Sequence, residues 1–170
     1  MRLILLRHTR PAVAAGVCYG ASDLDCADTF AQEAAALLPD LPAFDRLITS
    51  PLRRCRRLAD VIVAATDKPV TIDARLAEMD FGAWEGLRWD DIPRPEIDAW
   101  AADFHDARPH GGESIATFAA RVAGALADAR AAPGSTLMVT HQGVVRAARA
   151  AAERDDAWRF TLAYGGWIAI

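Results

Sequence analysis

The chain has 170 residues, of which 52% are apolar and 25% are charged, a composition typical of a folded protein and not of a disordered one. Its formal net charge of −4 argues against nucleic-acid binding by the protein as a whole. No stretch approaches the ~18 apolar residues of a membrane span, and the first apolar run is too short for a secretory signal.

The three cysteines, Cys18, Cys26 and Cys55, have neither the number nor the spacing of a disulfide framework. Reduced thiols are typical of the cytosol, so we expect a cytoplasmic protein. The length suits one domain with a sizeable core, and we therefore predict a single domain over residues 1–170.

Strand-like and helix-like patterns alternate along the first part of the chain. Residues 2–6 (RLILL) form a nearly continuous apolar run, as buried parallel strands do. A helix is predicted over 28–38, where Asp28 suits its start, and a second strand over 46–50. Ser50 and Pro51 then fit the N-cap and first position of a helix that continues to about residue 65.

The alternation continues after a long interruption. Residues 79–112 are rich in aromatic, acidic and proline residues and predict an irregular segment. The other predicted elements are a strand over 69–73, an amphipathic helix over 113–131, a strand over 136–141, a helix entered through Gly143 and a last strand pair within 160–170.

This order of elements predicts a three-layer α/β/α sandwich with a largely parallel central sheet. Such folds bind ligands at the carboxyl ends of their strands. Three predicted strands end in reactive residues: Arg7-His8 after the first, Ser50 with Arg54 after the second, and His141 after the fourth. Arginines bind phosphate oxygens and a histidine can attack phosphorus, so the set fits a reaction on a phosphate monoester.

Five segments make this chemistry specific. They are LRHTRP (6–11), TSPLRRCRRLAD (49–60), LAEMDFGAWEG (76–86), HGGES (110–114) and VTHQGVVR (139–146). In the same order they resemble the signature segments of the histidine phosphatase (phosphoglycerate mutase-like) superfamily. The resemblance implies the phosphoglycerate mutase-like fold and a phosphatase that needs no metal and no other cofactor.

The resemblance also implies a role for each matching residue. His8 is the expected nucleophile and becomes phosphohistidine, and Glu78 is the expected proton donor. The residues expected to bind the phosphoryl oxygens are Arg7, Arg54, His141 and Gln142. Glu85, seven residues after Glu78, is the competing proton donor. The arginines are expected to lower the pKa of His8 by charge repulsion.

Other polar and aromatic residues have simpler interpretations. Arg53, Arg56 and Arg57 are expected on a solvated helix face. His105 and His110 are expected at the surface. Trp84, Trp89 and Trp100 are expected mainly to pack, with one or two of them lining a pocket for an aromatic base.

The segment GVCYGASDLD (16–25), with RHTRP before it, resembles the α-ribazole phosphatase branch, whose substrate is α-ribazole 5′-phosphate of the cobalamin nucleotide-loop pathway. The expected partner is thus a small phosphate monoester, with a homodimer as a possible assembly. Three alternatives stay open: a broad-specificity phosphomonoesterase, a non-catalytic phosphate-binding module, and a metallohydrolase using His8, His141 and a carboxylate. The sequence lacks the HxH or HxxxH spacing that would favour the last.

Overall fold

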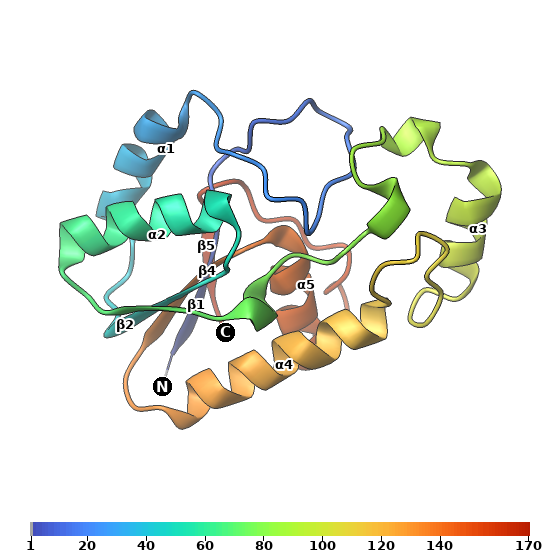
Figure 1. Ribbon diagram of the computed structural model, residues 1–170. Helices are drawn as coiled ribbons and strands as arrows, with labels where there is room; N and C mark the ends of the chain where they lie inside the picture. The colour runs from blue at the N-terminus through green and yellow to red at the C-terminus, as the bar shows by residue number, and fades with distance from the viewer. Residues whose placement is uncertain (1) are drawn as a thin grey trace.

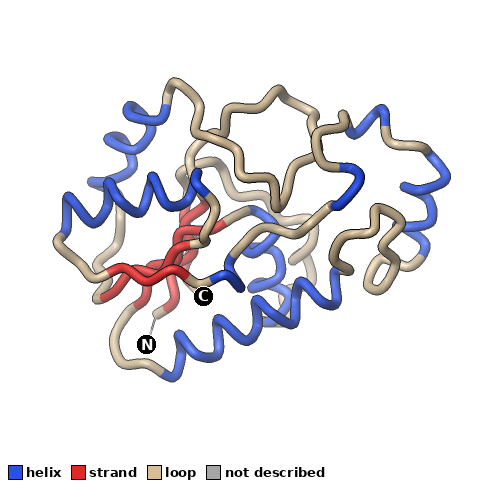
Figure 2. Tube along the Cα trace, in the orientation of Figure 1, coloured by secondary structure: helices blue, strands red, loops and turns tan. Residues whose placement is uncertain are grey.

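A five-stranded sheet runs through the centre of the computed structural model, which describes residues 2–170 (Figures 1 and 2). The strands lie in the order β3-β2-β4-β1-β5. All neighbouring strands pair in parallel except β5, which is antiparallel to β1. The strands are β1 (Leu3–Arg7), β2 (Arg46–Thr49), β3 (Val70–Ile72), β4 (Thr136–Thr140) and β5 (Trp167–Ala169).

Helices cover both faces of this sheet and complete three layers, as predicted. The α-helices are α1 (Phe30–Leu37), α2 (Arg53–Thr66), α3 (Arg94–Ala102), α4 (Ile115–Ala131) and α5 (Gln142–Ala151). Short 3-10 helices occupy Leu38–Asp40, Ala74–Leu76, Gly82–Trp84 and Trp89–Asp91. In Figure 1, α1 and α2 lie on one side of the sheet, α4 and α5 on the other, and α3 stands away from it.

The strands alternate their side chains between two cores. Ile4 and Leu6 of β1 pack with apolar residues of α1 and α2, whereas Leu3 and Leu5 pack with those of α4 and α5. This explains the continuous apolar run, since a strand covered on both faces has no polar side. None of the helices among residues 2–170 has the length and apolar character to cross a membrane.

Two predicted helix starts were wrong. Helix α1 begins at Phe30 and not at Asp28, and Thr29 occupies its N-cap without a side-chain hydrogen bond. Helix α2 begins at Arg53 with Leu52 at its N-cap, because Ser50 and Pro51 still belong to the turn that leaves β2.

The irregular segment contains α3, which the periodicity does not reveal because none of its residues is fully buried. The C-terminal strand pair is a single strand, β5. Residues 160–166 instead form a loop in which the backbone of Leu162 hydrogen-bonds to the side chains of Arg7 and Gln142.

The parallel register brings three strand ends to one edge of the sheet. Arg7 of β1 lies opposite Thr140 of β4, and Thr49 of β2 lies opposite Val139. The next residues continue this pairing: His8 N donates to Thr140 O at 2.9 Å, and Ser50 N donates to Val139 O at 3.0 Å. His8, Ser50 and His141 therefore emerge side by side.

Candidate active site

His8 is held at the end of β1 in a single orientation. Its Nδ1 lies 2.6 Å from the carbonyl oxygen of Thr9. A carbonyl only accepts hydrogen bonds, so Nδ1 carries the proton and Nε2 of the neutral ring keeps a free lone pair. The residue is 1% exposed, and its pKa is lowered to about 3.

The cause of that low pKa differs in part from the expectation. Burial is the largest contribution, repulsion from Arg54 follows, and Arg7 adds a smaller part, while the Thr9 carbonyl opposes them. His8 is therefore neutral throughout the physiological range, which is the state a nucleophile requires.

Two arginines flank this histidine. Arg54 is fully buried although it carries a charge, and it donates to Ser22 O and Gly20 O, both at 2.7 Å. Arg7 donates to Leu162 O at 2.6 Å and to Gln142 Oε1 at 3.3 Å. The Nε atoms of both arginines are buried and find no hydrogen-bond partner among residues 2–170. Buried N–H groups without acceptors are rare, and an anion bound beside His8 would supply the missing acceptors.

The loop that orients Arg54 is itself held by Glu85. Oε1 of Glu85 accepts from Ala21 N at 2.8 Å and from Phe81 N at 3.1 Å, and Oε2 accepts from Ser22 N at 2.7 Å and from the Ser22 hydroxyl. Burial pushes the pKa of Glu85 up, but these hydrogen bonds outweigh it and keep that pKa below its usual value. Glu85 is thus an ionised anchor of the loop.

Gly20 makes this loop possible. A β-carbon there would lie 1.8 Å from the carbonyl oxygen of Met79, so only glycine allows the two segments to approach. The contact places the Arg54-binding loop directly beside the segment that carries Glu78.

Glu78 takes a different position from Glu85. Its Oε1 accepts from Met79 N and its Oε2 from Gly143 N, each at 3.0 Å. Gly143 lies in the first turn of α5, where backbone N–H groups have no partner within the helix. Glu78 lines the same cavity as His8, whereas Glu85 is not among the residues that line it.

His141 lies behind His8, with ring centroids 5.1 Å apart. It is fully buried, and its Nε2 lies 2.7 Å from Ser50 Oγ and 3.4 Å from Cys55 Sγ. Burial, followed by repulsion from His8 and Arg54, holds its pKa well below the usual value. All three cysteines are free thiols and buried, in agreement with the sequence.

Gln142 contacts the C-terminal loop. Its carbonyl oxygen accepts from Leu162 N and Arg7, and its amide nitrogen donates to Phe160 O at 2.9 Å. The oxygen is fully used by these two bonds, and one amide N–H is left.

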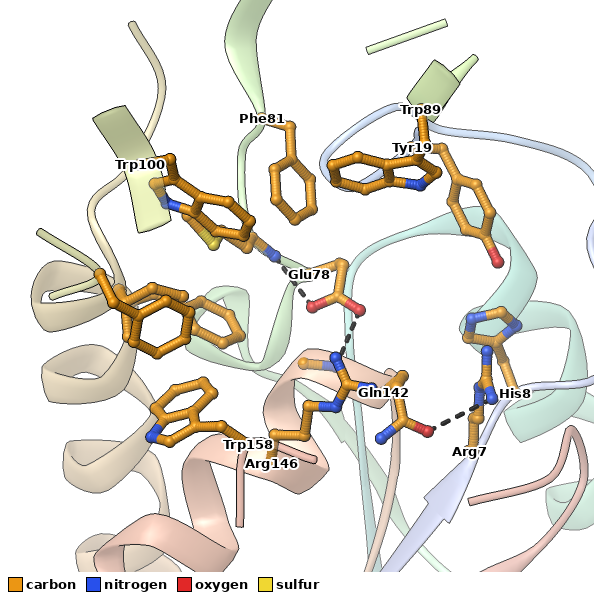
Figure 3. Close-up of a pocket in the computed structure, with 15 residues that line it drawn as sticks. Arg7, His8, Tyr19, Glu78, Phe81, Trp89, Trp100, Gln142, Arg146 and Trp158 are labelled. Carbon is orange, nitrogen blue, oxygen red and sulfur yellow. Dashed lines mark hydrogen bonds between the residues drawn. The ribbon is translucent and has the colours of Figure 1, made fainter. Parts of the chain in front are cut away.

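A cavity of about 390 Å³ opens in front of these residues. Figure 3 shows Arg7 and His8 on one side, Glu78 near the middle, and Trp100 and Trp158 on the far side. Most of its far wall is aromatic. Its lining residues are Arg7, His8, Tyr19, Glu78, Met79, Phe81, Trp89, Trp100, Phe104, Ile115, Phe118, Gln142, Gly143, Arg146 and Trp158.

Of the six residues singled out from the sequence, four line this cavity: Arg7, His8, Glu78 and Gln142. Arg54 and His141 are fully buried and lie beside His8 without lining the cavity. Arg53, Arg56 and Arg57 are exposed, as expected. The expectation for His110 was wrong: it is 2% exposed, because it packs against the rings of Trp84 and Phe81.

Sequence reasoning missed three residues of the site. Ser50 was interpreted as a strand-end residue and a helix cap but was given no role in the reaction, Tyr19 was interpreted only as part of a motif, and Arg146 was not assessed. Arg146 ends the segment VTHQGVVR, and its place one turn after Gln142 on α5 is the signal that would have found it. Within residues 2–170, no group of three or more histidine, cysteine, aspartate and glutamate side chains is arranged to hold a metal ion.

Comparison with known proteins identifies the family. The family model described as histidine phosphatase superfamily (branch 1) matches residues 3–170. The chain belongs to the histidine phosphatase superfamily. One similar relative is the adenosylcobalamin/α-ribazole phosphatase of Salmonella typhimurium, which is 32% identical over all of this chain and 90% of its own length.

The names of other similar proteins include more than one substrate. The glucosyl-3-phosphoglycerate phosphatase of Mycolicibacterium vanbaalenii is 31% identical over 99% of this chain and 71% of its own length. Among solved structures, a putative α-ribazole-5′-P phosphatase from Escherichia coli superposes with a TM-score of 0.87 at 29% identity, covering 100% of this chain and 89% of that one.

Proposed function

We propose that this protein is a phosphatase that hydrolyses a small phosphate monoester through a phosphohistidine on His8, without a metal. The proposed substrate is α-ribazole 5′-phosphate, in assembly of the cobalamin nucleotide loop. The observation that carries the proposal is the neutral His8, with its free Nε2, flanked by Arg7 and Arg54, whose buried Nε atoms have no acceptor among the residues described.

The first step is attack on phosphorus by the Nε2 lone pair of His8. The P–N bond forms while the bond between phosphorus and the leaving oxygen breaks. Arg7 and Arg54 bind the equatorial oxygens, whose charge persists through the transition state. His141 and the remaining N–H of Gln142 donate to the same oxygens in this proposal.

Glu78 is the proposed proton donor. It lines the cavity with His8, and its carboxyl group gives its proton to the leaving alcohol. In the second step it takes a proton from water as water attacks phosphorus. The P–N bond then breaks, inorganic phosphate leaves and His8 returns to its neutral form. Glu85 is unsuited because its two oxygens already accept four hydrogen bonds.

The aromatic wall of the cavity supports a leaving group with a flat ring. Trp89, Trp100 and Trp158 line it, together with Phe81 and Phe104. Stacking of a base on an aromatic side chain contributes about 1–3 kcal/mol. A benzimidazole nucleoside offers such a ring, whereas glycerate does not, which favours α-ribazole 5′-phosphate over phosphoglycerate. The name of the Salmonella relative agrees with this choice.

The test is phosphate release from α-ribazole 5′-phosphate, 3-phosphoglycerate and p-nitrophenyl phosphate, with EDTA present. We expect preference for the ribazole compound and loss of all turnover in His8→Ala. His105→Ala, an exposed histidine, is the matched control and keeps full activity. We also expose the Glu78→Gln variant to ³²P-labelled substrate. Phosphohistidine is expected to appear as protein-bound label that is lost in acid and retained in alkali. Turnover that persists in His8→Ala contradicts the mechanism, and phosphate binding without turnover supports the binding module.

Arg146 favours a second candidate, a phosphatase whose leaving group carries an anion. Its Nε donates to Phe160 O at 3.0 Å, and the guanidinium group lines the cavity with no carboxylate within 4 Å among residues 2–170. The Mycolicibacterium relative is named for such a substrate. If 3-phosphoglycerate is turned over best, and Arg146→Met lowers its kcat/KM about 10- to 100-fold, this candidate replaces the first.

The broader expectations remain proposals. The extent of the family match supports the proposal that residues 1–170 form one histidine phosphatase domain. The cytoplasmic location, the homodimer and the lack of a nucleic-acid partner stay predictions from the sequence.

A further inference from the structure

Ser50 lies at the end of β2 and contacts the ring of His141 in the interior. Both residues are fully buried, and Ser50 Oγ lies 2.7 Å from His141 Nε2. The contact joins two neighbouring strand ends directly behind His8. It is strong by its length, so the position of its proton determines which form of His141 is present.

The hydrogen-bond inventory around Ser50 decides that position. Ser50 Oγ already accepts from Leu52 N at 3.3 Å, so its own O–H still needs an acceptor. The two nearby acceptors are His141 Nε2 and the sulfur of Cys55. An imidazole nitrogen is a far better acceptor than a thiol sulfur, and the Cys55 thiol itself faces Thr140 O at 3.6 Å.

If His141 Nε2 carried the proton instead, the Ser50 hydroxyl would depend on sulfur alone. A buried O–H without a good acceptor is costly. We infer that Ser50 donates its hydroxyl proton to His141 Nε2 and thereby fixes His141 as the neutral Nδ1–H tautomer. Ser50 is a positioning residue that acts through His141.

In this tautomer, the Nδ1–H of His141 remains as a hydrogen-bond donor. His141 Nδ1 has, within the described part of the chain, only the Cys55 sulfur at 3.9 Å, a weak acceptor. Its N–H is therefore available to a phosphoryl oxygen. His141 then serves as a neutral donor, and the positive charge at the site comes from Arg7 and Arg54. The low pKa of His141 agrees with a neutral ring.

The inference rests on the proposed function, because the oxygen that receives the Nδ1–H is that of the substrate. Its first test does not need activity. Nitrogen-15 NMR of the histidine rings in the whole protein distinguishes a protonated from an unprotonated ring nitrogen, and the His141→Gln spectrum assigns the His141 signals. We expect His141 with Nδ1 protonated and Nε2 unprotonated at pH 7. A protonated Nε2 overturns the inference.

The second test uses variants. In Ser50→Ala we expect a mixture of tautomers and kcat lowered about 10- to 100-fold, with KM changed less than about threefold. Cys55→Ala is the matched control, since it removes the other neighbour of Nε2 and should leave the tautomer unchanged. Ser50→Thr keeps a hydroxyl and should restore the Nδ1–H signal.

The possible failures are distinct. An unchanged tautomer in folded Ser50→Ala, or a loss that falls only on KM, overturns the positioning role. If Ser50→Ala and Ser50→Thr do not fold, the wild-type spectrum alone decides. Absence of His8-dependent turnover in the wild-type protein refutes the proposed function and leaves the tautomer measurement standing on its own.

Discussion

Removing the charge of either glutamate in the segment LAEMDFGAWEG should change the activity and stability of the protein in a different way. Glu78 faces the cavity with two hydrogen bonds, and Glu85 anchors the Arg54-binding loop with four. Glu78→Gln removes the proposed proton donor, so the loss of activity should depend on how strongly the leaving oxygen requires protonation. Glu85→Gln weakens the hydrogen bonds that hold the Arg54-binding loop, so the loss of activity should be the same for every leaving group.

The magnitudes follow from these contacts. A hydrogen bond to a charged group contributes about 1.5–3 kcal/mol, and glutamine at position 85 would place an NH₂ group against N–H donors. We expect Glu85→Gln to cost about 3–5 kcal/mol of unfolding free energy, which lowers Tm by roughly 10 °C in a chain of this size. General acid catalysis contributes about 10²- to 10⁴-fold, and this is the loss expected for Glu78→Gln on an alkyl phosphate.

The assay is kcat/KM for α-ribazole 5′-phosphate and p-nitrophenyl phosphate, because this ratio reports the steps up to phosphoenzyme formation. p-Nitrophenolate leaves without a proton, so Glu78→Gln should lose about 10-fold or less on it. Glu85→Gln should lose similar factors on both substrates, together with the fall in Tm. The reverse pattern, with an unchanged Tm and a selective loss on the alkyl substrate in Glu85→Gln, would show that Glu85 is the donor and refute the reasoning.

Three further predictions concern the same cavity. Gly143→Ala places a β-carbon 2.2 Å from Glu78 Oε1, so the carboxyl group must move, and we expect kcat on α-ribazole 5′-phosphate to fall about 100-fold while circular dichroism stays unchanged. Trp89→Ala, at a cavity-lining residue that is 38% exposed, should raise KM for this substrate about 5- to 100-fold with little change for 3-phosphoglycerate; equal KM changes for both would argue against stacking. Because the pKa of His8 is about 3 in the folded protein and about 6.5 in the unfolded chain, the unfolded state binds more protons between these values, so unfolding free energy is retained above pH 6.5 and lost as pH falls. In urea titrations from pH 6.5 to 5, the slope for His8 alone should steepen from about 0.7 to about 1.3 kcal/mol per pH unit, and His8→Asn should remove that part; an unchanged slope would contradict the burial argument.

The sequence by itself determined the architecture and indicated most residues of the candidate site. The apolar run before Arg7 and the strand before His141, which is apolar at its centre, have the pattern of strands buried on both faces. In a parallel sheet such strands end at a common edge, so the meeting of His8 and His141 follows from local pattern and a general rule. The resemblance to the family segments supplied Glu78, which has no local pattern of its own, and it distinguished Arg54 from the neighbouring arginines.

Only the tertiary structure decided what each of these residues touches. Glu78 and Glu85 are both acidic residues of one segment, and their roles separate only because Gly143 N faces one and the 20–22 loop faces the other. The same holds for Ser50, whose sequence neighbours suggest a helix cap, while its strongest contact is with a residue 91 positions away. The aromatic wall around Trp100 likewise joins parts of the chain that are distant in sequence. Periodicity and motif spacing report on neighbours along the chain, and these contacts arise only when the sheet places separate strands and loops against each other.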